Sequence, residues 1–314
     1  MGTSLSFIEL LLPLYFMMLI GFLGRKLKVL SKATNEVLTQ LLLYISLPCL
    51  ILSSLNIPFS LPLVRAIFFL ILMSLFQFCL SIILAYYCRK HARLSPEEEP
   101  VYESLLIFGN QGFMGASVSY MLAGGEGVIY ISFFNIVYLL LLWTYGIYLF
   151  TKGRVSLPWR SLLFNPGLLA TGIGLCFFLF SLSLPLTVRV LLEELGKTTV
   201  PLSMILIGSM LAELRLKIIL ALLKNRYIWY ASVLKLIVIP SSLLLFLCLK
   251  PPFKLFSVAF MTAAMPSAPT ISLYAQKFGG STAFSSLGVI HSTLLCFITL
   301  PLLYWLLSYL YRFL

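Results

Sequence analysis

Residues 108–117 read FGNQGFMGAS, within an apolar stretch that runs from about residue 101 to residue 123. Glycine weakens a helix, so three glycines with an Asn-Gln pair between them make a continuous helix unfavourable here. In hydrocarbon, an opened backbone is stable only where protein groups or a water-filled cavity satisfy its amides and carbonyls. We therefore predict an unwound segment whose backbone meets a solute. A glycine-lined helix-packing face is the alternative.

A second interruption lies near the other end of the chain, where residues 263–270 read AAMPSAPT. Each proline lacks an N–H and clashes with the carbonyl four residues earlier, so Pro266 and Pro269 interrupt a helix. Ser267 and Thr270 can replace part of the lost bonding. We predict a second broken helix, with a simple kink as the alternative. If the two breaks cross, their half-helix N-termini place partial positive charge near the membrane midplane, which suits an anion.

The composition sets the class of protein around these two breaks. Of the 314 residues 61% are hydrophobic and 10% are charged, and the mean hydropathy is +1.04. A soluble domain is about half apolar and about a quarter charged, so a water-soluble enzyme is excluded. Because a transmembrane helix needs ~20 apolar residues, we predict an all-α polytopic membrane protein. Its ten predicted spans cover residues 5–24, 34–55, 64–88, 101–123, 127–150, 162–183, 188–213, 228–249, 255–278 and 282–310.

Lysine and arginine predict the orientation of these spans. The loops after the odd-numbered spans contain fifteen of the 22 basic residues, and the other loops with the C-terminal tail contain five. We therefore expect the odd loops in the cytoplasm and both termini on the non-cytoplasmic side of the cytoplasmic membrane. The first apolar stretch lacks a basic n-region and an A-x-A-like site, so we expect a retained span rather than a signal peptide. The six cysteines show no CxxC or Cys/His spacing, so we expect no metal and no other cofactor.

The two halves of the chain resemble each other weakly. LPCLIL at 47–52 and VPLSMI at 200–205 are related by the shift between Pro48 and Pro201, and the two helix breaks lie at a similar separation. Five spans per half is an odd number, so the second copy is inverted relative to the first. We predict two inverted repeats, residues 1–156 and 157–314, an arrangement typical of secondary transporters.

Three ionisable residues fall inside predicted spans: Lys197, Lys235 and His291. An intramembrane ionisable residue is costly and is by default a functional hypothesis. Lys197 follows Glu193 and Glu194 at helical spacing, so an intrahelical ion pair is the alternative. Lys235 lies deeper in its span, with snorkelling to the surface as the alternative. His291 is either a proton relay or a packing residue. The chain contains no aspartate, which removes the usual carrier of a coupled cation.

The glycine-rich segment at 109–115 resembles the GN-x-GF-x-G signature of the auxin efflux carrier family, which includes bacterial putative malate permeases and plant PIN-FORMED proteins. The family's proline after this signature falls at Ser117 here, so we expect the first break to depend on Gly112 and Gly115. Further matches cover nearly the whole chain. They are Asn165-Pro166, Pro201-Leu202 followed by Gly208, Lys235-Leu236 with Pro240, Met265-Pro266-Ser267-Ala268, Ser292-Thr293-Leu294-Leu295 and Thr299-Leu300-Pro301.

This resemblance implies the fold of the NhaA and bile-acid symporter type. A scaffold domain would hold spans 1, 2, 6 and 7, and a transport domain with spans 3–5 and 8–10 would move like an elevator. Broken spans 4 and 9 would cross at the substrate, and a homodimer would form through the scaffold domain. The predicted substrate-binding residues are Asn110, Gln111, Gly112, Ser117, Pro266, Ser267, Thr270 and Lys235, and the predicted coupling residues are Lys197 and His291.

We expect a secondary active or facilitative transporter of a small organic anion, a mono- or dicarboxylate, and not an enzyme. Helix N-termini, two intramembrane lysines and the missing aspartate favour negative charge at the site. Proton coupling and uniport both stay open. A non-transporting sensor of the same fold is one alternative. An intramembrane enzyme is the other, although neither HExxH nor GxSxG occurs. Loop asymmetry explains the net charge of +12, so we expect no nucleic-acid partner.

Overall fold

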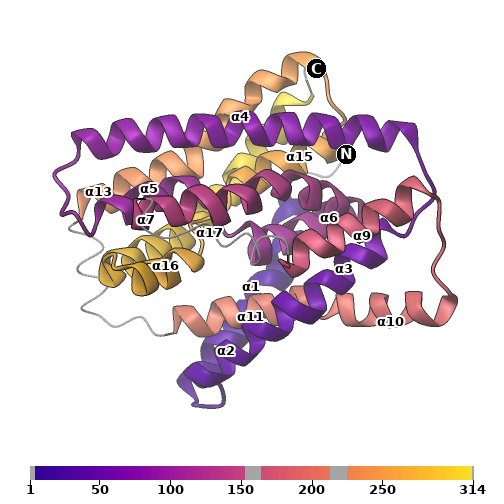
Figure 1. The fold of residues 1–314 in the computed structure, drawn as a ribbon, viewed down its shortest axis with the longest axis horizontal. Helices are drawn as coiled ribbons and strands as arrows, with labels where there is room; N and C mark the ends of the chain where they lie inside the picture. Colours follow the sequence, from indigo (N-terminus) through magenta and orange to yellow (C-terminus); the bar gives the residue numbers. More distant parts are fainter. Residues whose placement is uncertain (1–3, 153–163, 213–224, 313–314) are drawn as a thin grey trace.

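The computed structural model of the chain describes residues 4–152, 164–212 and 225–312. These residues form helices that are joined by short connections (Figure 1). In chain order the elements are α1 (Ser4–Lys26), α2 (Lys32–Leu41), η1 (Leu42–Ser46), α3 (Leu47–Leu55), α4 (Leu61–His91), α5 (Glu99–Ile107), η2 (Gln111–Gly115), α6 (Ala116–Leu141), η3 (Leu142–Gly146), α7 (Ile147–Thr151), α9 (Pro166–Leu179), α10 (Leu186–Lys197), α11 (Thr199–Leu211), α13 (Arg226–Val233), η4 (Leu234–Val238), α14 (Ile239–Ser242), η5 (Leu243–Leu249), α15 (Phe253–Ala263), α16 (Thr270–Phe278) and α17 (Thr282–Leu310).

Helices occur at the positions of the predicted spans. Five helical runs are long and apolar enough to cross a membrane, namely Lys32–Leu55, Leu61–His91, Gln111–Thr151, Arg226–Leu249 and Thr282–Leu310. The 41-residue run Gln111–Thr151 is not one straight helix, because Ala123 and Gly124 inside α6 have non-helical dihedral angles and φ of Gly124 is +58°. That turn lies between predicted spans 4 and 5. The multi-pass, all-helical class is therefore confirmed at the level of fold class.

Side-chain caps explain where several helices begin. The Asn165 carboxamide oxygen accepts from the backbone N–H groups of residues 167 and 168, so α9 starts at Pro166. Asn225 caps α13 in the same way, and Ser31 and Ser281 cap α2 and α17. Asparagine and serine are preferred at this position because their side chains satisfy N–H groups that the helix leaves unpaired.

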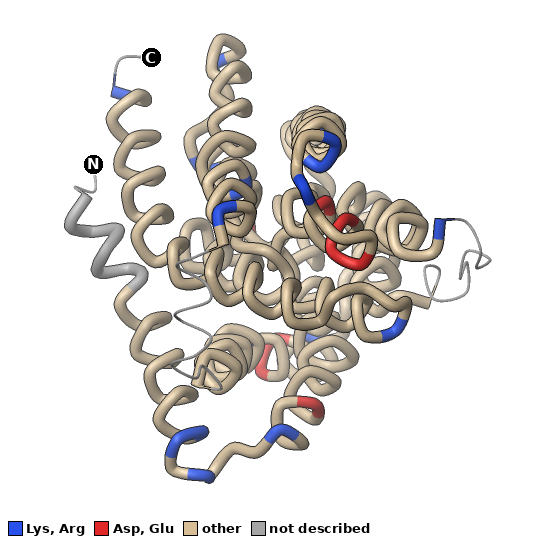
Figure 2. Tube along the Cα trace, turned by 90° about the vertical axis from the view of Figure 1, so that its left-hand side faces the viewer, with Lys and Arg blue, Asp and Glu red and all other residues tan. Residues whose placement is uncertain are grey.

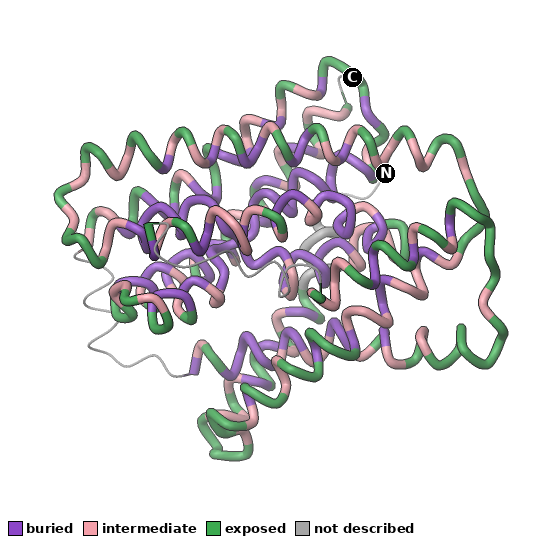
Figure 3. Tube along the Cα trace, viewed as in Figure 1, coloured by how far each residue is buried: buried purple, intermediate pink, exposed green. Residues whose placement is uncertain are grey.

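Many close helix contacts fall into two sets, and the sets also contact each other through α3 and α6, α1 and α17, and α11 and α6. In the first set, α1 lies along α11, and α3 lies between α9 and α10. In the second set, α4 lies across α5 and α6, α15 packs against α6, and α13 packs against α17. Figure 1 shows α4 running along one edge of the molecule. The buried residues concentrate where α5, α6, α15 and α17 meet, whereas α4 and α10 have exposed outer faces (Figure 3).

Figure 2 shows basic residues at many helix ends and connections. Some residues of the predicted cytoplasmic loops, namely Arg154, Arg160, Arg215, Lys217 and Lys224, lie outside the described residues. The predicted orientation therefore stays a prediction.

Two glycines allow α1 and α11 to approach closely. A Cβ atom added at Gly208 would collide with the backbone of Met18, and one added at Gly21 would collide with the backbone of Ile205. Small residues at such contacts let helix backbones pack directly, which is a main source of helix association in membranes.

We expect Gly208→Val to lower the free energy of unfolding by about 1–3 kcal/mol, because overpacking a tight contact costs that much. The measurement is thermal or denaturant unfolding of the purified protein in detergent. Gly172→Val on α9 is the matched control, because a Cβ there meets nothing within 4 Å. Equal stability of the two variants would show that the α1–α11 contact is not close-packed.

Candidate functional site

The two interrupted segments meet in the interior of the molecule. The backbone between α5 and η2 pairs antiparallel with the backbone between α15 and α16, through a bridge between Gly109 and Ser267. Two hydrogen bonds flank the bridge, from Asn110 N–H to the Pro266 carbonyl (2.6 Å) and from Ala268 N–H to the Phe108 carbonyl (3.0 Å). Each break therefore satisfies polar groups that the other leaves unpaired. We call these two paired segments, residues 108–110 and 264–269, the crossing.

The first break lies earlier than expected. Phe108 and Asn110 have non-helical dihedral angles, whereas Gly112 and Gly115 lie within the helical turn η2. The expectation that the break depends on Gly112 and Gly115 is therefore wrong. The glycine that matters is Gly109, because a Cβ there would lie 3.2 Å from the Met265 carbonyl oxygen and 3.3 Å from the Lys235 Nζ.

Lys235 provides a hydrogen-bond donor for a backbone carbonyl at the C-terminal end of α5. Its Nζ donates to the Ile107 carbonyl (3.1 Å), and its side chain is fully buried. Among the described residues, no carboxylate lies within ion-pair distance of it. A cation at a helix C-terminus is favourable because the last carbonyls carry partial negative charge. One carbonyl does not neutralise a full charge, so a protonated Lys235 would need an anion beside the crossing.

Ser267 connects the crossing to two further helices. Its hydroxyl donates to the Leu105 carbonyl of α5 (2.8 Å), and its N–H donates to the Ser292 hydroxyl of α17 (3.1 Å). Ser267 thus bonds outside its own helix, because Pro266 and Pro269 leave it no helical partner. Ser292 belongs to the matches with the carrier family, but the sequence did not indicate its contact with the crossing.

Unpaired polar groups lie next to the crossing. Gln111 is fully buried, and neither its Oε1 nor its Nε2 has a partner among the described residues. Asn110 is 5% exposed, and its side chain does not cap η2. Gly112 and Thr270 are partly exposed at the starts of the two half-helices, and a Cβ on Gly112 would meet nothing within 4 Å. Buried amides without partners are unfavourable, so this arrangement suits a bound polar molecule.

The structure thus brings most of the predicted substrate-binding residues to one place. The residues in or beside the crossing are Asn110, Gln111, Gly112, Lys235, Pro266, Ser267 and Thr270. Ser117 lies elsewhere, since its hydroxyl donates to the Phe113 carbonyl and contacts the Ser203 hydroxyl of α11 at 2.9 Å.

The two predicted coupling residues differ in position. The Lys197 side chain is 58% exposed and forms an ion pair with Glu194, which matches the alternative interpretation of this lysine. Lys197 therefore lies outside the set of residues at the crossing. His291 is buried on α17, where its Nδ1 lies 2.7 Å from the Ser232 hydroxyl.

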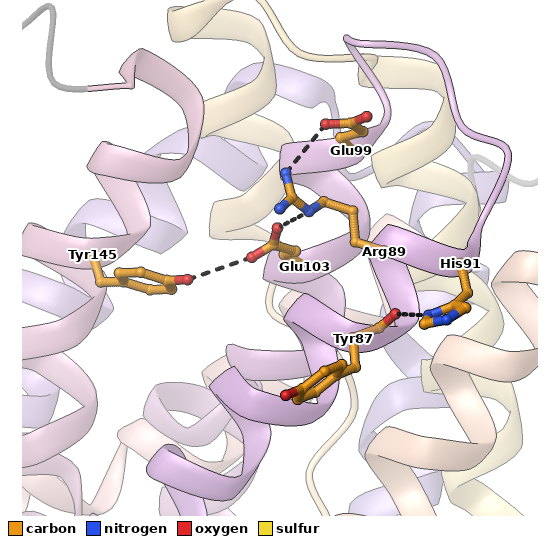
Figure 4. Close-up of polar contacts among 6 residues, drawn as sticks. All are labelled: Tyr87, Arg89, His91, Glu99, Glu103 and Tyr145. Carbon is orange, nitrogen blue, oxygen red and sulfur yellow. Dashed lines mark hydrogen bonds and ion pairs between the residues drawn. The ribbon is translucent and has the colours of Figure 1, made fainter.

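A buried acidic cluster was missed by the sequence analysis (Figure 4). Glu103 on α5 pairs with Arg89 at the end of α4, and the Tyr145 hydroxyl donates to Glu103 at 3.4 Å. Arg89 also pairs with Glu99 at 3.3 Å. The spacing of Glu99 and Glu103 places both on one face of a helix, and this was the available signal. Their predicted position at a span end suggested solvent instead of a partner.

A scan against family models matches the chain to a family described as membrane transport proteins, over residues 6–157 and 154–304. A search of curated proteins finds no match to the chain.

We expect Arg89→Gln to lower the free energy of unfolding by about 3 kcal/mol, since it leaves the buried Glu103 carboxylate unpaired. The value is at the low end for a buried pair because Arg89 is 28% exposed. Denaturant unfolding of the single variant and of the double variant Arg89→Gln/Glu103→Gln tests this. The double variant removes the unpaired charge and should regain most of the lost stability. If it is no more stable than Arg89→Gln, the pair is not the source of the effect.

Proposed function

Because the chain belongs to the auxin efflux carrier-type family of membrane transport proteins, we propose that it transports a small organic anion across the cytoplasmic membrane. The matched ranges cover nearly the whole chain, so membership in a family of membrane transporters concerns the entire protein. The substrate class, a mono- or dicarboxylate, and the direction of movement belong to the proposal.

The observation that carries the proposal is the buried Lys235 side chain, which has no acidic partner among the described residues. A buried ammonium without a counter-ion is unfavourable by several kcal/mol, and the Ile107 carbonyl offsets only part of this. An anion at the crossing would offset the rest. The carboxamide of Gln111, which lacks a protein partner, and the N–H groups at the start of η2 and α16 would add neutral donors.

The packing of the helices supports an elevator movement. We propose that α1–α3 and α9–α11 form the scaffold domain and that α4–α7 and α13–α17 form the transport domain. One described contact between these domains is the pair of hydroxyls of Ser117 and Ser203. Apolar side chains of both domains also pack together, with Met18 and Met204 in one buried cluster with Met114, and such non-directional contacts can be exchanged as the domains slide.

Two contacts support an inverted-repeat origin. Ser46 and Thr198 pair through their hydroxyls at 2.9 Å and are 152 residues apart, and Gly109 pairs with Ser267 at a similar separation. The separations of 152 and 158 residues lie close to the shift of 153 between Pro48 and Pro201, so each contact joins positions that are nearly equivalent in the proposed repeats 1–156 and 157–314. The matched ranges also divide the chain near residue 156. By the distribution of basic residues, we propose that both termini lie on the outer side.

The experiment is charge movement in proteoliposomes on a solid-supported membrane. Rapid jumps of acetate, malate and benzoate at two pH values would identify the acid that gives a saturable current. We expect Asn110→Ala to lose this current. If no acid gives a current, exchange of the same acids in labelled form follows. If neither measurement detects movement of an acid, the transport proposal is wrong and a non-transporting sensor of the same fold is favoured.

We expect Lys235→Ala to weaken the apparent affinity for the transported acid by about hundredfold or more, since a charge contact worth about 3 kcal/mol is lost. Uptake at rising acid concentration measures this, and gel filtration shows whether the variant is folded. Lys254→Ala is the control, because Lys254 is 66% exposed. Uptake at the wild-type level in folded Lys235→Ala would show that Lys235 does not bind the transported acid.

A further inference from the structure

Only one of the two ring nitrogens of His291 has a hydrogen-bond partner among the described residues. His291 is 5% exposed, and its Nδ1 lies 2.7 Å from the Ser232 hydroxyl of α13. Its Nε2 is buried and has no hydrogen-bond partner among the described residues. A buried polar atom without a partner costs about 1–3 kcal/mol, so packing alone does not explain an imidazole here. In either tautomer one ring nitrogen of the neutral imidazole is unprotonated and can bind a proton.

Both helices that hold His291 also contact the crossing. On α17, the next residue is Ser292, whose hydroxyl accepts from the Ser267 N–H. On the other helix, Ser232 precedes Lys235 by three residues, about one turn, and Lys235 bonds to the Ile107 carbonyl. A positive charge on His291 would therefore lie between two helical elements that hold the crossing in place.

The surroundings of α17 contain charged residues of both signs. The elements packed against it are α13, η4, α5, α16, α15 and α1. Their charged and titratable residues whose side chains the structure describes are Arg226, Tyr227, Tyr230, Lys235, Glu99, Tyr102, Glu103, Tyr274, Lys277, Lys254, Tyr15, Arg25 and Lys26.

The acids in these surroundings have other partners. Glu99 and Glu103 are paired with Arg89, and neither forms an ion pair with His291 or Lys235. A proton on His291 would thus add a second buried positive charge near Lys235, with no described acid to neutralise it. A bound anion would offset both charges.

We propose that His291 binds a proton taken from water when an organic anion binds at the crossing, so that the two are carried together. This inference rests on the proposed function and deepens it, since it makes the carrier a proton–anion symporter. By linkage, the proton and the anion raise each other's affinity by the same factor. Histidine is suited to this role because it changes charge between about pH 5 and pH 8.

The proton site can be tested without any substrate. The Trp229 ring lies 4.3 Å from the His291 ring in an edge-to-face contact, so a protonated imidazole should quench its fluorescence. We expect the fluorescence of the full-length protein in nanodiscs to fall as the pH is lowered, and to fall at a higher pH when the transported acid is present, because the bound anion stabilises the charged imidazole. Both His291→Gln and Trp229→Phe should abolish this titration.

The second histidine of the chain supplies the matched control. His91 is exposed at the end of α4, where its Nδ1 lies 2.8 Å from the Tyr87 carbonyl (Figure 4). His91→Gln should therefore keep the titration. If His291→Gln does not fold, the wild type, His91→Gln and Trp229→Phe still decide the question. A titration that survives in Trp229→Phe or in folded His291→Gln, or that vanishes in His91→Gln, overturns the proton site.

The coupling is tested with the acid that gives a current in the panel above or, for a monoanion, with labelled uptake, because one proton carried with one monoanion moves no net charge. We expect its apparent affinity to be about tenfold higher at pH 6 than at pH 8, within the usual range of coupling between two sites. The ratio should be about one in His291→Gln. If transport saturates with the same apparent affinity at both pH values, the proton–anion symport is wrong, whereas the proposal that the protein transports the acid still holds. A fluorescence titration without any current or exchange would overturn the carrier but leave the proton site.

Discussion

The structure depends on the requirement that backbone polar groups in a membrane interior find partners within the protein. The two helix interruptions, at residues 108–110 and 264–269, expose several such groups. The breaks satisfy one another through the bridge between Gly109 and Ser267 and the hydrogen bonds beside it. Neither break would be stable alone. The crossing is therefore a single unit built from two distant segments, and the helices around it are arranged to support it.

The groups that support the crossing also determine its chemistry. Lys235, Ser267 and Ser292 satisfy carbonyl and N–H groups that the breaks leave free. In doing so they place a buried amino group and two hydroxyls beside the crossing. The amide of Gln111 stays without a partner. A protein that needed only stability would have no reason to keep these groups unpaired, and their placement is what makes an anion site chemically reasonable.

The contacts within and between the two sets of helices differ in kind. Inside the first set, Gly21 and Gly208 let α1 and α11 pack backbone against backbone. Inside the second set, the buried pair of Arg89 and Glu103 joins α4 to α5. Between the sets lies a neutral contact between the hydroxyls of Ser117 and Ser203. The two sets also share apolar packing, since Met18 and Met204 belong to the same buried cluster as Met114.

The sequence by itself determined the all-helical membrane class, the positions of the helices and the presence of two breaks, because these follow from hydropathy, glycine and proline. It also identified Lys235, since a lysine deep in an apolar stretch stands out. The tertiary structure decided the rest. The first break lies at residues 108–110 because the backbone of the second break pairs with it there. Local helix propensity contains no information about such a distant pairing. Lys197 is exposed, Ser117 faces α11 and Glu103 is buried with Arg89, because the direction of a side chain is set by neighbouring helices that are remote in the sequence.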